Sequence, residues 1–309
     1  MQTVTAFAPA TVANVGIGFD ILGHTVQAVG DRVCLKRIAE PVVRIRAVTG
    51  VAGKLPVDPM SNTAGRAVQA MRSALGLTFG FELTIEKGIP LASGMGGSAA
   101  SAVAAVVAAN ALIEEPVPTL RLLKFAMEGE IVASGSAHMD NIAPCLFGGL
   151  VLTVGIDHPR VKQIPVPPRV RCVLVHPHMH LGTREARALL KSDVTRSDFV
   201  WQTANLAGFI SGCYSNDLDM IRDSFNDVII EPQRQTLIPG FKDVQSGAMS
   251  AGALGCSISG AGPSVFAWAE IERAEPVRAA MVAAFARHSL GSDSWISALD
   301  NAGARVVDT

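Results

Sequence analysis

The sequence predicts an α+β protein of two domains, and three observations support this. The chain has 309 residues, and at about 150 residues per domain this length suits two domains with a core each. Segments with alternating apolar residues, typical of strands, are interspersed with segments of helical spacing. Four prolines between residues 157 and 169 indicate a linker, so we place the domains at 1–165 and 166–309.

The composition indicates which classes of partner to exclude and in which cell compartment to expect the protein. The net charge is −1, whereas a nucleic-acid binder usually has a basic excess, so we expect no nucleic-acid partner. The five cysteines are scattered without C-x-x-C spacing, which is typical of reduced core residues in a cytoplasmic protein. The first residues do not resemble a signal peptide, and the Ala-rich run 99–111 is shorter than the roughly 20 residues that span a bilayer. We therefore expect no membrane partner.

The first segments of the chain combine a polar loop, strands and a helix. Residues 9–20 form a loop in which Asn14 can donate and accept hydrogen bonds and Asp20 can hold an ammonium group; the alternative is that both cap their own backbone. Residues 29–48 alternate and predict a strand hairpin. A helix follows from about residue 62, with Ser61 or Asn62 as its N-cap, although Asn62 could instead contact a nucleotide base.

The segment 79–111 is a strand, a glycine-rich loop and a buried helix. Amides of such a loop and the positive end of the helix form a site for an anion, and phosphate is the obvious one. No lysine follows the last glycine, which excludes a Walker A loop. Gly94, Gly96 and Ala99 also fit a dinucleotide fingerprint, with Glu114 or Glu115 at a tolerable distance, so an oxidoreductase is an alternative. A simple packing turn is another.

A helix over residues 119–132 carries Glu128 and Glu130 near its end, and a polar loop, 134–144, follows. A hydroxyl and a carboxylate are typical ligands of Mg²⁺, so Ser98 and one of these glutamates could bind the ion. The alternatives are a solvated helix face for either glutamate and a buried imidazole for His138.

The second half begins with a strand at 170–175. The pattern His176-Pro177-His178-Met179-His180 places three imidazoles at alternate positions, as a metal site would need, but Pro177 interrupts the run. Thr183 is expected to cap a helix that carries Arg187, and Arg187 and Arg234 could clamp a carboxylate or phosphate, or could be surface charges. Helices are expected at 197–213, 216–228 and 272–288, a last strand at 304–307, and a second glycine loop between two strands at 255–264.

Three glycine-containing segments in this order resemble the GHMP kinases. They read P-A-T-V-A-N-V-G-I-G-F-D at 9–20, P-L-A-S-G-M-G-G-S-A-A-S at 90–101 and S-G-A-G-P-S at 259–264. The resemblance implies a two-domain GHMP-kinase fold. Its N-terminal mixed α/β domain would bind nucleotide with the strand–Gly loop–helix unit, and its C-terminal domain would be a ferredoxin-like α/β sandwich. Segments 130–144, 183–187 and 231–234 are similar to the branch of the family that phosphorylates L-homoserine.

The resemblance implies ATP-dependent phosphorylation of the homoserine side-chain hydroxyl, with ATP and Mg²⁺ as cofactors, and it suggests a homodimer. Glu130 and Ser98 would hold Mg²⁺, and Asn141 would lie at the reacting hydroxyl. ATP would contact Asn62, Lys87, Pro90, Leu91, Ala92, Ser93, Gly94, Met95, Gly96, Gly97, Ser98, Ala99 and Ala100. Homoserine would contact Asn14, Asp20, His138, Asn141, Thr183, Arg187, Arg234 and Gly260.

The implied mechanism relies on positioning more than on a base. Phosphoryl transfer has a loose transition state, so alignment and charge stabilisation can supply most of the catalysis. The resemblance places Asn141, not a carboxylate, at the hydroxyl, whose proton would leave to a phosphate oxygen or to water. A kinase for another small alcohol and an inactive nucleotide sensor are the alternatives within the family.

Overall fold

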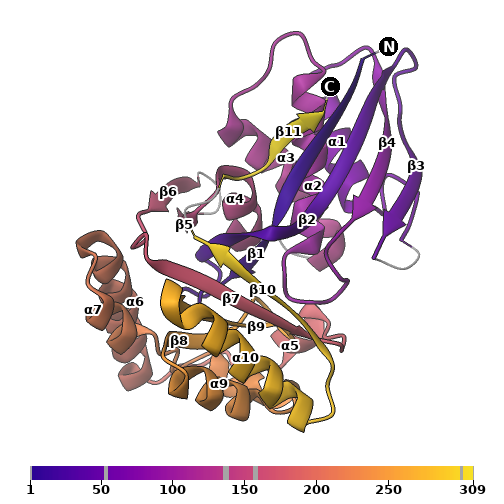
Figure 1. Ribbon diagram of the computed structural model, residues 1–309. Coiled ribbons are helices and arrows are strands. Elements are labelled where there is room, and N and C mark those ends of the chain that lie inside the picture. Colours follow the sequence, from indigo (N-terminus) through magenta and orange to yellow (C-terminus); the bar gives the residue numbers. More distant parts are fainter. Residues whose placement is uncertain (1, 52–54, 135–138, 156–158, 300–301, 309) are drawn as a thin grey trace.

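The computed structural model describes residues 2–51, 55–134, 139–155, 159–299 and 302–308, arranged around two sheets (Figure 1). The first sheet has the order β11-β1-β2-β4-β3, with β5 beside the start of β2 and β6 beside β5. Its pairs are antiparallel except that β3 runs parallel to β4. The strands are β1 (Thr3–Ala13), β2 (Leu22–Ile38), β3 (Val43–Gly50), β4 (Gly80–Lys87), β5 (Leu150–Val154), β6 (Arg160–Ile164) and β11 (Arg305–Asp308).

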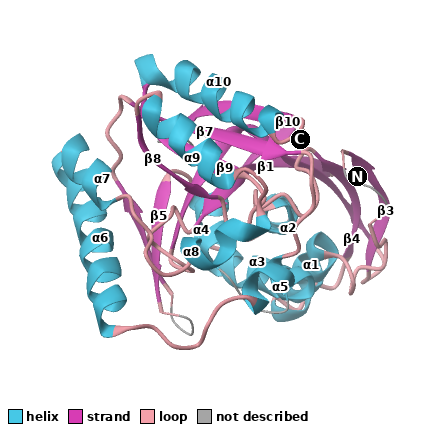
Figure 2. Ribbon diagram, turned by 90° about the horizontal axis from the view of Figure 1, so that it is seen from below, coloured by secondary structure: helices cyan, strands magenta, loops and turns pink. Residues whose placement is uncertain are grey.

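The second sheet is antiparallel throughout and has the order β10-β7-β9-β8. Its strands are β7 (Val170–Pro177), β8 (Ala253–Ile258), β9 (Val265–Glu270) and β10 (Ser292–Ala298). Helices α9 (Phe241–Ser250) and α10 (Ile271–Arg287) pack together on one face of it (Figure 2). This is the two-layer arrangement expected for the C-terminal part.

The remaining helices lie in two groups. Helices α1 (Thr63–Ala74), α2 (Gly97–Ala111), α3 (Thr119–Ser134) and α4 (Met139–Phe147) pack against one another beside the first sheet. Helices α6 (Arg196–Ser215) and α7 (Leu218–Ser224) form a pair at one edge of the molecule (Figures 1 and 2). The short helices α5 (Thr183–Ala188) and α8 (Glu231–Arg234), with a 3₁₀ turn at Gln235–Leu237, complete the set.

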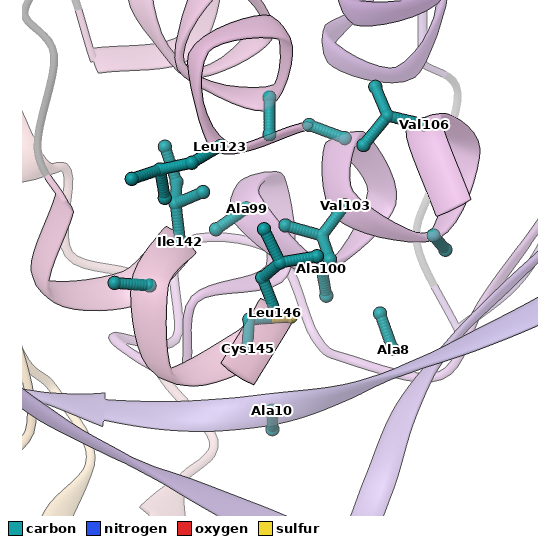
Figure 3. Packing of buried hydrophobic residues seen from close by; sticks show 14 of the residues in the cluster. Ala8, Ala10, Ala99, Ala100, Val103, Val106, Leu123, Ile142, Cys145 and Leu146 are labelled. Carbon is teal, nitrogen blue, oxygen red and sulfur yellow. The ribbon is translucent and has the colours of Figure 1, made fainter. Parts of the chain in front are cut away.

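Helix α2 is the central helix of the first layer. Its sequence is nearly all Ala and Val, so it has no polar face and is buried almost all round, as a helix apolar on every side must be. Figure 3 shows small side chains of α2 above those of β1, with Leu123 of α3 farther from the strand and Cys145 and Leu146 of α4 beside α2. Because alanine side chains are short, the sheet and two helices can pack closely around α2, which fixes the direction in which its N-terminus points.

The two cores meet along β7. Because successive side chains of a strand point to opposite faces, Cys172 and Leu174 enter the first core, whereas Val173 and Val175 enter the core under α9 and α10. On the neighbouring strand, the indole N–H of Trp268 donates to Nε2 of His24 on β2 across 3.2 Å. The two sheets are therefore joined by a polar contact within apolar packing.

Several expected elements differ in the structure. Residues 29–48 do not form a hairpin, because β4 lies between β2 and β3 and pairs with both. The loop expected at 134–144 is largely helical, since α3 reaches Ser134 and α4 begins at Met139 and includes Pro144. Strand β6 occupies part of the proline-rich segment, α7 is shorter than the helix expected at 216–228, and β10 was not predicted.

Candidate active site

A cavity of about 500 Å³ opens where the glycine loop, the loop at 14–20 and helix α5 meet. It brings together most of the predicted site residues: Asn14, Asp20, Asn62, Lys87, the residues from Pro90 to Ser98, Glu130, Asn141, Thr183, Arg187, Arg234 and Gly260. Ala99 and Ala100 do not line it, because their side chains face the core from the first turn of α2. His138 lies outside the described residues.

The glycine loop presents backbone amides to this cavity. Gly96 caps α2 with a left-handed φ of 68°, so the helix begins at Gly97. The first amides of a helix have no acceptor within it, and together with the positive end of the helix dipole they suit a bound anion. Gly96 has no possible replacement in this geometry, because a Cβ there would lie 2.1 Å from Oγ1 of Thr11.

The dinucleotide alternative does not match this topology. In a dinucleotide fold the helix after the glycine loop crosses over to a strand parallel to the one before the loop, whereas here α2 leads into α3, and the strand parallel to β4 is β3, which precedes the loop. The loop is instead held by its neighbours. Ser259 donates from Oγ to the Gly94 carbonyl at 2.7 Å, and the Ser264 amide donates to the Ser93 carbonyl at 3.2 Å. The second glycine loop therefore supports the first.

Lys87 has a different environment from the one expected of a residue near ATP. Its side chain is 3% exposed and forms an ion pair with Asp31, which is fully buried. Nζ also donates to the Gly97 carbonyl at 2.6 Å and to Ser101 Oγ at 2.9 Å, while Asp31 Oδ1 accepts from the amides of Gly88 and Ile89. The network ties the entrance of the glycine loop to the first turn of α2. A nucleotide contact by Lys87 stays a prediction.

Asn62 is the N-cap of α1. Its Oδ1 accepts from the amides of Ala64 and Gly65 at 3.0 and 3.3 Å, and its Nδ2 donates to the Pro56 carbonyl. The capping role is confirmed, and it fixes the side chain at the cavity wall. A contact with adenine stays a prediction.

Glu130 and Ser98 meet beside the helix start. The Ser98 hydroxyl forms a hydrogen bond with the carboxylate of Glu130, which is buried in α3. Burial raises the pKa of Glu130 to about 7; the Ser98 hydrogen bond and the charge of Lys87 oppose this rise, and Asp140 adds to it. Ser98 and Glu130 both offer oxygen atoms beside the glycine loop, which suits a small divalent cation. A buried Glu130 does not match the alternative of a solvated helix face.

One end of the cavity is built from the predicted charged groups Asp20, Arg187 and Arg234 around Phe19, a residue that the sequence did not single out. Arg187 Nη2 donates to both carboxylate oxygens of Asp20, at 2.7 and 3.0 Å. The guanidinium carbons of Arg187 and Arg234 lie 5.3 and 5.2 Å from the Phe19 ring centre, within the range of cation–π attraction. Thr183 also lines this end, but Gly182, not Thr183, is the N-cap of α5.

Gly260, from the second glycine loop, connects the two halves of this end. Its carbonyl accepts from Asn14 Nδ2 at 2.9 Å and from Arg234 Nη1 at 3.2 Å. Asn14 Oδ1 in turn accepts from the Asp20 amide at 3.0 Å. Asn14 and Asp20 both have positive φ, 69° and 62°, so the loop holds a backbone shape that these side-chain contacts stabilise.

Asp140 is a site residue that sequence reasoning missed. It is 4% exposed, it lines the cavity, and its Oδ1 has no hydrogen-bond partner among the described residues. Burial, and secondly the negative charge of Asp20, raise the pKa of Asp140 to about 7, against the attraction of Arg187 and Arg234. A buried carboxylate with acceptor capacity left over can receive a ligand N–H.

The three histidines of the H-x-H-x-H pattern have separate partners. His176 contacts Ser264 Oγ, His178 contacts Asp293, and His180 contacts the Leu91 carbonyl. Burial lowers the pKa of His176 to about 4, so its imidazole is neutral. This arrangement does not support a metal site.

Comparisons with known proteins agree with this geometry. A family model described as the GHMP kinases N terminal domain matches residues 62–149, and one described as GHMP kinases C terminal matches 209–287. The chain is 49% identical over 308 residues to a homoserine kinase of Xanthomonas campestris pv. campestris, covering 99% of this chain and 95% of that protein. It is 42% identical over 322 residues to a homoserine kinase of Chlorobaculum tepidum, covering 100% and 99%.

Solved structures give the same picture. The crystal structure of homoserine kinase from Cytophaga hutchinsonii superposes with a TM-score of 0.96 at 44% identity, covering 99% of this chain and 98% of that one. A galactokinase from Lactococcus lactis has a TM-score of 0.69 at 14% identity, which shows a shared fold alone.

Proposed function

This chain belongs to the GHMP kinase family, and we propose on that basis that it transfers the γ-phosphoryl group of ATP to the side-chain hydroxyl of L-homoserine. Full-length relatives named homoserine kinases support the substrate. The observation that carries the proposal is the cavity itself. One end offers amides at a helix start to phosphates, and the other offers arginines and carboxylates to a zwitterion.

The charged end suits an α-amino acid. Guanidinium groups bind a carboxylate through paired N–H donors, so Arg187 and Arg234 would receive the substrate carboxylate. Asp20 and Asp140 would receive the ammonium group, which offers three donors. A sugar or a simple alcohol has no charges to match these four groups, so this end favours homoserine over other small alcohols.

The phosphate end would hold ATP and Mg²⁺. The amides between Gly94 and Ala99 would contact the phosphates, with the adenine toward Asn62. Ser98 and Glu130 would hold the ion, which supplies charge neutralisation to the phosphates when bound. In its ionised form Glu130 would provide the negative ligand, and its hydrogen bond with Ser98 holds the two side chains next to each other.

In the reaction, the homoserine hydroxyl oxygen forms a bond to the γ-phosphorus while the bond from phosphorus to the β,γ-bridging oxygen breaks. The hydroxyl proton leaves to a phosphate oxygen or to water. The helix start would stabilise negative charge on the phosphates, and Asn141 would align the hydroxyl. O-phospho-L-homoserine and ADP are the products, and threonine biosynthesis is the implied use.

A direct assay tests the substrate. The protein is incubated with ATP, Mg²⁺ and, in parallel, L-homoserine, mevalonate, galactose or L-serine, and ADP formation is followed. We expect the highest kcat/KM with L-homoserine. ADP formation with mevalonate or galactose, but not with homoserine, would overturn the assignment. Replacing Mg²⁺ by a chelator should stop turnover, and titration of Glu130→Gln with Mg²⁺ should show weakened binding.

We also propose that the chain forms a homodimer through the outward face of α6. Between Phe199 and Asn216 this helix carries no charged residue, although Phe199 and Trp201 are 63% and 62% exposed. A solvated helix face normally carries charges. Val200, Ala207 and Tyr214 repeat every seven residues on one face, so antiparallel pairing about Ala207 would set Val200 against Tyr214 of a second copy.

Light scattering after gel filtration tests this interface. Val200→Glu, on the proposed contact stripe, should shift the mass from dimer to monomer, whereas Ile271→Glu, at an exposed apolar position on α10, should leave it unchanged. A monomeric wild-type protein would refute the proposal.

In the described part of the chain no helix is long and apolar enough to cross a membrane. We propose a cytoplasmic location, supported by five cysteines that all remain thiols.

A further inference from the structure

Thr11 lies behind the reacting end of the cavity and contacts one residue of it. Its Oγ1 donates to Oδ1 of Asn141 across 2.7 Å. Thr11 is fully buried in β1, and its amide donates to the Met95 carbonyl of the glycine loop at 3.1 Å. Asn141 lies on α4 and lines the cavity. The hydrogen bond therefore connects the sheet to the side chain expected at the substrate hydroxyl.

The chemistry of an amide gives this contact a direction. A side-chain amide has an oxygen that only accepts and a nitrogen that only donates. Because the oxygen of Asn141 is directed at the Thr11 hydroxyl, its Nδ2 group is directed away from Thr11. The pair lies beside Gly96, the N-cap of α2, since a Cβ on Gly96 would be 2.1 Å from Thr11 Oγ1 and 2.8 Å from Asn141 Oδ1.

We propose that Thr11 is a positioning residue that fixes the orientation of the Asn141 amide, so that Asn141 donates an N–H to the homoserine hydroxyl oxygen. A hydroxyl oxygen that accepts from Asn141 directs its own proton elsewhere, toward the γ-phosphate oxygens. Asn141 then aligns the nucleophile and takes no proton from it. This inference rests on the proposed phosphorylation of homoserine.

The chain supplies a matched control for Thr11. Thr25 is the residue opposite Thr11 in the β1–β2 ladder, and it is also fully buried. Its Oγ1 has no hydrogen-bond partner among the described residues. Thr25→Val removes the same hydroxyl from the neighbouring strand without touching Asn141, so it measures the effect of the substitution on packing.

The test is a double-mutant cycle on kcat with homoserine. Thr11→Val keeps the shape of the side chain and removes the donor, and it should lower kcat about ten-fold, the scale of one hydrogen bond in the transition state. KM for ATP should change less than about two-fold. Thr11→Ser should restore kcat to near the wild-type value, and Thr25→Val should resemble the wild type. In an Asn141→Ala background, Thr11→Val should have almost no further effect.

The outcomes separate the possible failures. If the wild type does not consume homoserine, the proposed function fails. If the wild type is active and Thr11→Val equals it, or lowers kcat equally with and without Asn141, the positioning role is wrong. If Thr11→Val does not fold, Thr11→Ala and Thr11→Ser are compared in the same cycle, and equal kcat for these two variants would refute the role of the hydroxyl.

Discussion

Arg187 pairs with a neighbouring carboxylate and is also suited to bind the carboxylate of a ligand. It forms an ion pair with Asp20 and lies against Phe19. A zwitterion offers both members of the pair a second partner, since its carboxylate suits Arg187 and its ammonium group suits Asp20. In the proposed binding mode, the pair would keep both side chains at the positions that the substrate needs.

We predict that Arg187→Ala raises KM for homoserine about 100-fold, because a charged hydrogen bond contributes roughly 1.5–3 kcal/mol. KM for ATP should stay within about two-fold, because the phosphate end is built from other residues. Steady-state kinetics measure both constants. Arg160→Ala, on the exposed edge of β6, serves as the control for loss of positive charge. An unchanged KM for homoserine would remove Arg187 from the substrate site.

The ionised carboxylate of Glu130 should lower the stability of the fold, although it is the form needed to bind Mg²⁺ in the proposed site. Its pKa is raised from 4.5 to about 7 by burial, so the folded state binds the proton more tightly than the unfolded state. Stability is therefore lost as the pH rises from 4.5 to 7. The full shift corresponds to about 3 kcal/mol at 1.36 kcal/mol per pKa unit.

We predict that Glu130→Gln raises the melting temperature at pH 8 and has little effect on it at pH 4.5. The same variant should lose at least about 100-fold in Mg²⁺-dependent kcat, since the neutral amide cannot supply the ionised ligand. Thermal unfolding at the two pH values and kinetics at pH 8 measure this. A lower melting temperature at pH 8 would show that the carboxylate stabilises the fold after all.

At the scale of elements, the glycine loop depends on close contacts that its own sequence cannot supply. Gly94 is held by the second glycine loop, and Gly96 lies against Thr11 of β1. Asp31 and Lys87 tie the loop entrance to α2 from below. The position of the glycine loop is thus set by three segments that are distant in sequence.

We predict that Gly96→Ala destabilises the protein by more than about 2 kcal/mol and raises KM for ATP, because backbone strain and a steric clash act together. Gly76→Ala is the matched control: Gly76 also has positive φ, 61°, but a Cβ there meets nothing within 4 Å. It should lose only about 1 kcal/mol and no ATP affinity. Denaturant unfolding measures the stability of both variants, and steady-state kinetics measure their KM for ATP. The difference between the two variants reports the steric clash, because both have the backbone strain. Equal losses would exclude the contact with Thr11.

At the scale of the whole molecule, a histidine joins the two sheets. The Nδ1–H group of His24 donates a hydrogen bond to the Thr25 carbonyl, and its Nε2 accepts one from the Trp268 indole N–H. Burial lowers the pKa of His24 to about 4, which outweighs the opposing effect of the Thr25 carbonyl. Between pH 6.5 and 4 the unfolded state binds a proton that the folded state does not, so stability falls as the pH falls.

We predict that this histidine removes up to about 3 kcal/mol of stability between pH 7 and pH 4. His24→Gln should therefore show a smaller loss over this range, even if it is less stable at pH 7. Urea unfolding at several pH values gives the two slopes. The comparison cancels Glu130 and Asp140, whose raised pKa values act in the opposite direction. Parallel slopes for the two proteins would contradict the assignment.

Sequence reasoning located what is encoded locally and missed what depends on long-range pairing. The glycine loop and α2 were identified correctly, and Asn62 was one of the two residues named as the cap of α1, because glycine, alanine and capping residues act within a few positions. The hairpin at 29–48 was wrong because β4, more than 30 residues later, pairs between its strands. Thr11 and Asp31 are polar residues inside strands, and nothing in their neighbourhood indicates the groups they bind.

The pairing of β11 with β1 has a consequence for synthesis of the protein. Strand β1 lies between β2 and β11, so the part of its edge at Thr5–Phe7 gains a strand partner only from residues 305–308. While the chain emerges from the ribosome, the sheet next to the glycine loop keeps that part of its edge uncovered until nearly all other segments have been made. An uncovered strand edge attracts other strands. Nascent chains stalled before residue 305 should therefore aggregate or recruit chaperones more readily than chains released after residue 308.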